Sequence, residues 1–476
     1  MALTQQPHPA AVSRRAGGPG RPSASPLAPG SALTSPDRGG PDRGDLDEAP
    51  IGPLHRRVVL TSGVGFFTDA YDLFVISTVA VLVGAQWHLS TTATSWVTGS
   101  AILGAFVGAF AFGRLADVHG RKRVYLAVAI VMALGAITSA FAQNVVWLVA
   151  ARFVLGLGIG GDYPVSAVLM SEFSNRRDRG RLVGLVFSMQ AVGLVVGPLV
   201  ALGLFGAGAG SQLTWRLLLG LGAVPAAAVV YLRSKIPESP RFEAGRAGSD
   251  RPARRPTRGA PAERPTGGRA PAAGSRRLAT LVVGTAGAWF FFDYAYYGNT
   301  LSLPTILREV DPTATLTTKL ALTLAMFVLF AVPGYLLAVL RMDRFGHRRL
   351  QIVGFAVMCG AFALLAAVPA LTTTVAPFVA IFGLSYFFVE FGPNTTTFVL
   401  PSEVFPARLR TTGHGVAAGI GKLGAFAGVF LVPQLQHQIG LRGMLAIASA
   451  ASALGLLVTV PLPEPSGRSL DHLGGK

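Results

Sequence analysis

Repeated apolar runs of about 20 residues constrain the fold of this chain more than any other feature, because each is long enough to cross a lipid bilayer as a helix. Charged residues make up only 13% of the chain, against about 25% in a typical soluble domain. The sequence therefore predicts an all-α membrane protein with twelve transmembrane helices. The candidate spans lie near residues 58–84, 94–116, 124–142, 145–170, 181–204, 214–234, 279–304, 317–341, 349–369, 374–400, 411–433 and 440–462.

The basic residues indicate how these spans are oriented. A net charge of +18 could suggest a nucleic-acid partner, but the Lys and Arg residues lie in loops between the apolar runs. Basic loops at 121–123, 176–179 and 344–349 all follow even-numbered spans, which is the distribution typical of cytosolic loops. We therefore expect a multi-pass protein of the plasma membrane, embedded in the lipid bilayer with both termini in the cytosol, and no nucleic-acid binding.

Two segments differ in composition from the apolar spans. Residues 1–54 are rich in Pro, Gly and Ser and lack an apolar core, which predicts a disordered cytosolic tail. Residues 237–277 are rich in Pro, Gly, Ala and Arg, which predicts a cytosolic linker. These segments frame an N-terminal six-helix half at 55–236 and a C-terminal half at 278–463, followed by a cytosolic tail at 464–476.

The two predicted halves repeat one another. The sequence DVHGR at 117–121 returns as DRFGH at 343–347, an offset of 226 residues. The pair Ser171-Glu172 returns as Ser402-Glu403, an offset of 231 residues. A duplication of six helices is typical of secondary transporters, which bind substrate near the bilayer midplane between the repeats.

Several polar residues lie deep inside the apolar spans, where a charge is costly and usually functional. Asp162 follows two glycines within the fourth span. Trp289, Asp293 and Tyr297 are spaced to share one helix face. Asp293 stands sixteen residues beyond Arg277, about 24 Å along a helix. These three residues could form an aromatic packing stripe with a helix-end acid, but the depth of Asp293 favours a binding site.

Four more polar residues reach a comparable depth in other spans. Lys422 lies twelve residues beyond Arg410, about 18 Å along a helix, so it either pairs with a carboxylate or faces an anionic substrate. Gln190 could serve equally as a hydrogen-bonding contact between helices. Tyr163 and Asn394 are separated by the same repeat offset of 231 residues.

Asp69 and Asp72 form an i, i+3 pair in the first span. One interpretation is a polar face near the mouth of a cavity. The other is a proton relay that includes Asp162, because acidic chains inside membranes often carry protons.

Several motifs resemble those of a known family. The repeated loop after Asp117, together with PESPR at 237–241, resembles the major facilitator superfamily. GGDYP at 160–164, the Trp289 stripe and GPNTTTF at 392–398 resemble its phosphate:proton symporter branch. The resemblance extends over about residues 55–465.

The resemblance implies a role for each deep polar residue. Phosphate contacts are implied for Tyr163, Gln190, Trp289, Asp293, Tyr297, Asn394 and Lys422. Proton coupling is implied for Asp69, Asp72, Asp162 and Asp293. The family often has a Glu three residues after a Tyr in the third span, whereas Val128 follows Tyr125 here.

Charged residues at cytosolic helix ends are expected to gate the site through ion pairs between helices. The residues are Asp117, Arg121, Glu172, Asp343, Arg348 and Glu403.

These features together predict a monomeric, proton-coupled transporter that imports inorganic phosphate by alternating access. A proton symporter for an organic anion, such as an aromatic or dicarboxylic acid, is the alternative, and a nutrient sensor that binds without transport is a third possibility. We expect no enzyme activity, cofactor or metal. The glycines at 156–161 are not followed by the Lys and Ser or Thr of a nucleotide-binding loop.

Overall fold

The structure is a computed structural model that describes residues 52–173, 179–235, 272–406 and 409–466. Most of the predicted N-terminal tail, linker and C-terminal tail lies outside these residues, so their predicted disorder and cytosolic position stay predictions.

The first half of the described chain consists of helices. They are α2 (Pro53–Gln86), α3 (Thr91–His119), α4 (Arg121–Ala140), α5 (Val145–Phe173), α6 (Arg179–Ser188), α7 (Gln190–Gly206), α8 (Ser211–Leu221) and α9 (Ala223–Ser234).

The second half is helical as well. Its α-helices are α11 (Ala272–Leu301), α12 (Leu303–Val310), α13 (Leu316–Met326), α14 (Val332–Phe345), α15 (His347–Ala367), α16 (Val375–Val389), α17 (Thr395–Val404) and α18 (Arg410–Thr459). Two π-helical turns, η1 (Phe327–Ala331) and η3 (Glu390–Asn394), and one 3₁₀ turn, η2 (Pro369–Leu371), complete it.

These helices account for the twelve predicted transmembrane spans. Eleven of the described helical segments are long and apolar enough to cross a membrane. The last of them, α18, contains two spans, because Gly440 has a positive φ of 71° that interrupts the helix. The prediction of an all-α protein with twelve transmembrane helices is therefore confirmed, with boundaries that agree to within a few residues.

Glycines bring the central helices of the first half close together. A Cβ added to Gly156 would lie 1.9 Å from the carbonyl oxygen of Ala101, and one added to Gly160 would lie 2.0 Å from that of Ala105. Only glycine fits such a close approach of two helices. This contact between α3 and α5 fixes the position of Asp162, two residues beyond Gly160.

A similar contact shapes the second half. A Cβ on Gly424 of α18 would lie 2.2 Å from the carbonyl oxygen of Phe290 on α11. The backbones of α11 and α18 therefore run close together. This approach brings Lys422 of α18 within reach of Asp293 of α11.

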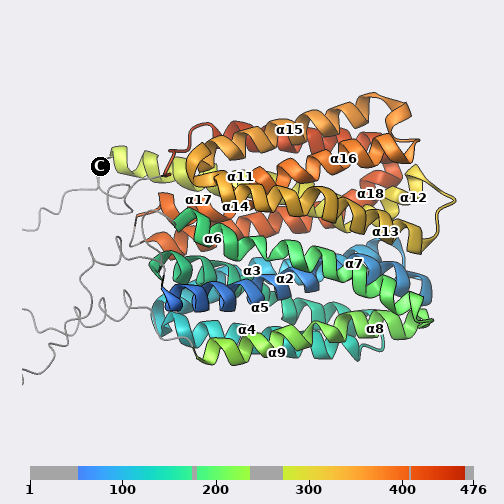
Figure 1. The fold of residues 1–476 in the computed structure, drawn as a ribbon, viewed down its shortest axis with the longest axis horizontal. Helices are drawn as coiled ribbons and strands as arrows, with labels where there is room; N and C mark the ends of the chain where they lie inside the picture. Colours follow the sequence, from blue (N-terminus) through green and yellow to red (C-terminus); the bar gives the residue numbers. More distant parts are fainter. Residues whose placement is uncertain (1–51, 174–178, 236–271, 407–408, 467–476) are drawn as a thin grey trace, which may run out of the picture. The chain divides into compact units, whose positions relative to one another are not determined.

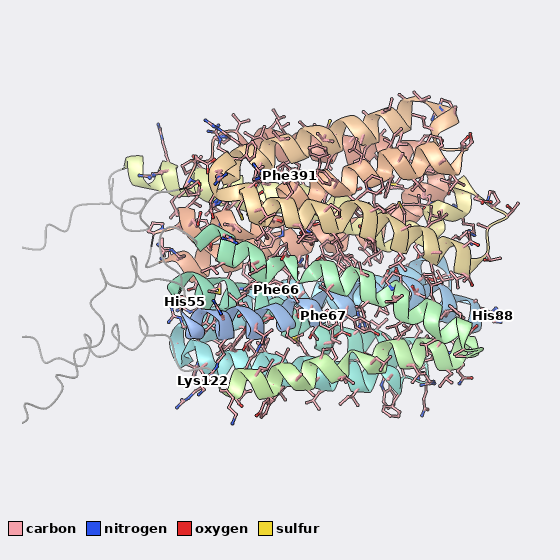
Figure 2. All side chains as sticks on the ribbon, in the orientation of Figure 1. His55, Phe66, Phe67, His88, Lys122 and Phe391 are labelled. Carbon is pink, nitrogen blue, oxygen red and sulfur yellow. The ribbon has the colours of Figure 1, made fainter. Side chains whose placement is uncertain are left out.

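The two halves meet along their central helices (Figure 1). Contacts join α2 with α11, α3 and α5 with α18, and α6 with α14. Figure 2 shows His55 and Lys122 at one end of the helices and His88 at the opposite end. The basic loop after α3 and the start of α2 thus share one end of the molecule, as the charge pattern predicts.

Candidate functional site

The centre of the candidate site is a buried ion pair between the two longest helices of the second half. Lys422 Nζ lies 3.1 Å from Asp293 Oδ2 and donates a second hydrogen bond, also 3.1 Å long, to the Tyr297 hydroxyl. The Lys422 and Asp293 side chains are only 2% and 1% exposed. Of the two possibilities that the sequence left open for Lys422, the structure shows pairing with a carboxylate.

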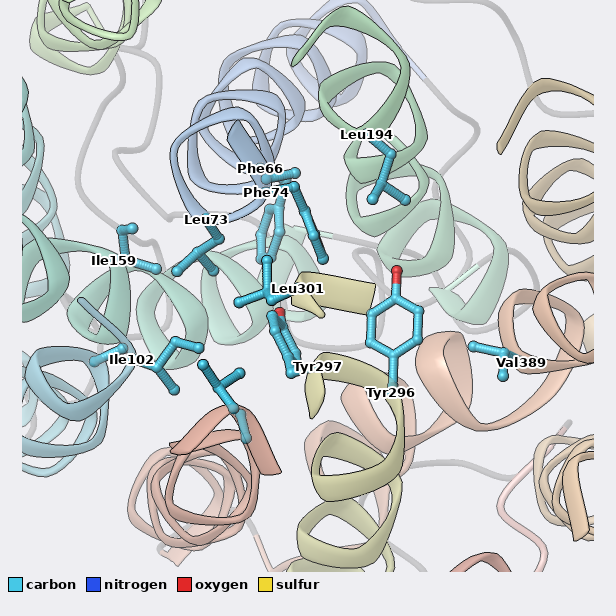
Figure 3. Close-up of a cluster of buried hydrophobic side chains, with 14 of the residues drawn as sticks. Phe66, Leu73, Phe74, Ile102, Ile159, Leu194, Tyr296, Tyr297, Leu301 and Val389 are labelled. Carbon is cyan, nitrogen blue, oxygen red and sulfur yellow. The ribbon is translucent and has the colours of Figure 1, made fainter. Parts of the chain in front are cut away.

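Aromatic rings surround the Lys422 ammonium group. Its nitrogen lies 4.6 Å from the ring centre of Tyr163 and 4.4 Å from that of Tyr297, distances typical of cation–π contacts. Phe74 of α2 stacks on Tyr297 with a centroid distance of 5.4 Å, and both residues are labelled in Figure 3. The Trp289 ring lies 6.3 Å from that of Tyr163. Side chains from both halves therefore enclose the ion pair.

A chain of hydrogen bonds leads from this site across the contact between the halves. Gln190 Nε2 donates to the Tyr163 hydroxyl at 3.0 Å. The Tyr335 hydroxyl donates to Gln190 Oε1 at 2.9 Å, and Asn394 Nδ2 donates to the Tyr335 hydroxyl at 2.7 Å. The structure thus brings together all seven residues for which the sequence predicted phosphate contacts. Tyr335 is an additional member that sequence reasoning missed.

Glu390 is a second residue that sequence reasoning missed. It is fully buried in η3, and its Oε2 accepts a hydrogen bond of 2.5 Å from Asn394 Nδ2. A signal existed in the sequence, because Glu390 is an acid inside the predicted span 374–400.

A second buried ion pair lies within the first half. Arg233 Nη2 of α9 contacts Asp162 Oδ1 of α5 at 2.6 Å, and both side chains are fully buried. The guanidinium stacks over the Tyr125 ring at 3.6 Å, and Ser166 Oγ donates to Asp162 Oδ1 at 3.0 Å. Sequence reasoning missed Arg233 because it stands at the end of its span, where an Arg is ordinarily a cytosolic loop residue.

We expect Arg233→Met to destabilise the protein by about 3–5 kcal/mol, because it leaves the Asp162 carboxylate buried without its cation. Thermal unfolding in detergent measures the change. Arg233→Met combined with Asp162→Asn should recover part of the loss, and Arg123→Met, at an exposed arginine, serves as the control. An unchanged unfolding temperature in Arg233→Met would contradict this role.

Asp69 lies between the two ion pairs. It is fully buried and interacts electrostatically with Asp162 and Arg233 of the first half and with Lys422 of the second. Neither carboxylate oxygen of Asp69 has a hydrogen-bond partner among the described residues. This position is compatible with the predicted proton relay, which stays a prediction.

Asp72 is placed differently. It is fully buried beside Arg152, whose Nη2 donates to the Asp72 backbone oxygen at 2.5 Å. Arg152 is a further buried cation that sequence reasoning missed. The Asp72 carboxylate faces Gly222, where an added Cβ would lie 2.3 Å from its Oδ1.

Comparison with known proteins decides the family. The family model described as Major Facilitator Superfamily matches residues 63–429. The chain belongs to this superfamily. Its members are transporters, so the protein is a transporter and not an enzyme.

Curated relatives narrow the family further. Probable inorganic phosphate transporter 1-6 of Arabidopsis thaliana is 34% identical over an alignment that covers 90% of this chain and 95% of the relative. Inorganic phosphate transporter 1-6 of Oryza sativa subsp. japonica is 35% identical over an alignment that covers 90% of this chain and 94% of the relative. These matches confirm the resemblance to the phosphate transporter branch of the major facilitator superfamily.

A solved structure confirms the fold independently. The proton:xylose symporter XylE from E. coli, bound to 6-bromo-6-deoxy-D-glucose, aligns with a TM-score of 0.70 at 19% sequence identity. The alignment covers 88% of this chain and 98% of that chain.

The predicted gate of this major facilitator protein is partly described. Asp343 Oδ2 accepts a hydrogen bond of 3.1 Å from the Arg181 backbone nitrogen, which joins α14 of the second half to α6 of the first. His347 lies between Asp343 Oδ1 at 3.2 Å and Glu403 Oε2 at 2.9 Å. The Arg348 backbone nitrogen donates to Glu464 Oε2 at 3.1 Å.

The structure describes the other predicted gate residues in less detail. The Arg348 side chain donates to the Val460 carbonyl oxygen. Arg121 begins α4. The side chains of Asp117 and Glu172 lie outside the described part of the structure.

A cavity of about 470 Å³ opens between the halves at the end opposite this gate. Its walls include Thr98 of α3, Arg308 of α12 and Gln436 of α18. The contact at one end and the cavity at the other form the asymmetry that alternating access requires.

Proposed function

We propose that this protein imports inorganic phosphate together with protons across the plasma membrane. The main observation behind the proposal is the buried Lys422–Asp293 pair. Neutral hydrogen-bonding side chains from both halves surround this pair. Tyrosine hydroxyls, amides and the Trp289 indole are the kinds of group that bind a tetrahedral oxyanion. The names of the relatives described above support phosphate as the substrate.

The coupling follows from competition for Lys422. While Asp293 is charged, the Lys422 ammonium group is neutralised by a carboxylate 3.1 Å away. A proton on Asp293 removes that charge and frees the ammonium group for phosphate. Loss of the proton restores the ion pair and expels the anion. Proton and phosphate therefore bind and leave together, which is reciprocal linkage between two ligands.

Alternating access requires the two ends of the protein to open in turn. We infer that phosphate enters through the 470 Å³ cavity and that the contact between Asp343 and the Arg181 backbone holds the other end closed. One chain contributes every side chain of the candidate site, so we propose that the monomer is the transporting unit.

Uptake of radiolabelled phosphate into proteoliposomes tests the substrate. We expect arsenate, a close analogue of phosphate, to compete and aromatic or dicarboxylic acids to have little effect. The alternative of an organic-anion symporter derives support from the aromatic rings around Lys422, and efficient competition by such acids would favour it. Binding without flux would indicate a sensor.

We predict that the end carrying residues 121–123 faces the cytosol, because basic loops remain on that side. Single cysteines at Thr92 and Arg123, introduced into a Cys359→Ser background, test this orientation with an impermeant maleimide. The Thr92 position should react in intact cells, and the Arg123 position should react only after permeabilisation. The reverse pattern would place both termini outside.

A further inference from the structure

Glu390 is a buried acid that the coupling scheme above does not use. Glu390 is 0% exposed and lies in η3. The backbone of this turn departs from helical geometry at Gly392, which has φ −117° and ψ −105°. Among the described residues, no Lys, Arg or His lies within ion-pair distance of Glu390, and its Oε1 has no hydrogen-bond partner. A carboxylate in this position has an uncompensated negative charge inside the membrane, which is unfavourable.

In the described part of the chain, the titratable groups that interact with Glu390 are neutral phenols. Tyr335 of α14, Tyr296 of α11 and Tyr386 of α16 interact with it electrostatically. The helices α15 and α17 also pack against η3, but His347 and Glu403 on these helices bond to each other at 2.9 Å. A proton is therefore the remaining means of neutralising Glu390.

Glu390 is connected to the candidate phosphate site. Asn394 Nδ2 donates both to Glu390 Oε2 and to the Tyr335 hydroxyl, at 2.5 and 2.7 Å. Tyr335 donates to Gln190 at 2.9 Å, and Gln190 donates to Tyr163 at 3.0 Å. The chain crosses from the second half to the first between Tyr335 and Gln190. It ends at the ring that faces the Lys422 ammonium group.

We propose that Glu390 is a second proton-binding residue whose protonation is linked to phosphate binding through this hydrogen-bond chain. An anion near Tyr163 adds negative charge to a region that already contains the Glu390 carboxylate, so binding favours a proton on Glu390. The proton comes from water, forms an O–H bond on Glu390 and returns to water when phosphate leaves. The inference rests on the proposed phosphate transport and adds a proton-binding group in the second half.

Glu390→Gln tests the proposal, because glutamine keeps an acceptor for Asn394 but cannot titrate. Phosphate dissociation constants of purified protein in detergent are measured between pH 5 and 8. The slope of their logarithm against pH gives the number of protons taken up with phosphate. The titration of phosphate itself is common to all variants and cancels in the comparison.

We expect the slope of Glu390→Gln to be smaller than that of the parent by up to one proton per phosphate. A difference of one proton corresponds to about a tenfold change in phosphate affinity per pH unit. The difference should arise at high pH, where the variant binds phosphate more tightly than the parent. Asp311→Asn, which removes a partly exposed carboxylate in the α12–α13 turn, should keep the parental slope. Equal slopes in Glu390→Gln and the parent would overturn the proposal.

Tyr335→Phe decides the question if Glu390→Gln does not fold. It removes the hydroxyl that joins Asn394 to Gln190 and leaves Glu390 in place. A reduced slope supports linkage through the chain, and a parental slope contradicts it. A parent protein that binds no phosphate at any pH would instead refute the proposed function itself.

Discussion

Asp293→Asn is expected to lower phosphate accumulation driven by a pH gradient by about tenfold per pH unit, while preserving exchange of phosphate across the membrane. Asparagine is nearly isosteric with aspartate and cannot carry the coupling proton. It also leaves Lys422, 3.1 Å from the native carboxylate, permanently available to the anion. Residue 293 should therefore make no contribution to the pH dependence of phosphate binding in this variant. Each proton coupled to phosphate supports about tenfold accumulation per unit of pH gradient, and this variant lacks the one that Asp293 carries.

Two measurements in proteoliposomes check this result. Exchange of external labelled phosphate for internal phosphate reports binding and movement of the site, and net uptake under an imposed pH gradient reports coupling. The Asp311→Asn variant provides an acid-to-amide control on the protein surface. If Asp293→Asn accumulates phosphate as strongly as the parent, Asp293 carries no coupling proton, and Asp69, Asp162 and Glu390 are the remaining candidates.

Lys422→Ala is expected to produce the second large effect, a fall in phosphate affinity of roughly 10–100-fold. A charge-assisted hydrogen bond to an anion contributes about 1.5–3 kcal/mol. The same substitution leaves Asp293 buried without its cation, which costs about 3–5 kcal/mol of stability. Equilibrium binding of labelled phosphate and thermal unfolding separate these two effects.

The double variant Lys422→Ala/Asp293→Asn distinguishes a binding role from a structural one. It leaves no unpaired charge at the position of the Lys422–Asp293 pair, so its unfolding temperature should recover toward that of the parent, whereas its phosphate affinity should remain low. Lys235→Ala removes an exposed lysine and serves as the matched control. Recovery of affinity together with stability would show that Lys422 only neutralises Asp293.

The sequence was sufficient to predict the transmembrane helices and most of the candidate site. Apolar runs and repeated motifs can be read directly from the sequence, so the twelve spans could be predicted without a structure. The depth of Asp293 and Lys422 followed from counting residues along a helix. Their pairing could not be derived, because 129 residues separate them and the contact depends on how closely α11 and α18 approach.

Other members of the charge network escaped prediction for physical reasons. Arg233 stands at a helix end, and only the packing of α9 against α4 carries it into the interior, beside Asp162. Arg152 lies inside the predicted span 145–170, so a charge within an apolar run was a signal there that sequence reasoning overlooked. Glu390 did carry a signal, an acid within an apolar run. Its connection to Tyr163 depends on a chain that passes through Tyr335, a residue with no motif of its own.

Flux in proteoliposomes containing the purified parent protein tests the central claim most directly. Labelled phosphate uptake is followed under an imposed pH gradient, acidic outside, together with the pH inside the vesicles. We predict phosphate accumulation above its external concentration, accompanied by internal acidification that requires phosphate, and loss of both when the gradient is collapsed. Uptake that only equilibrates phosphate, or that proceeds equally without the gradient, would contradict proton-coupled phosphate import.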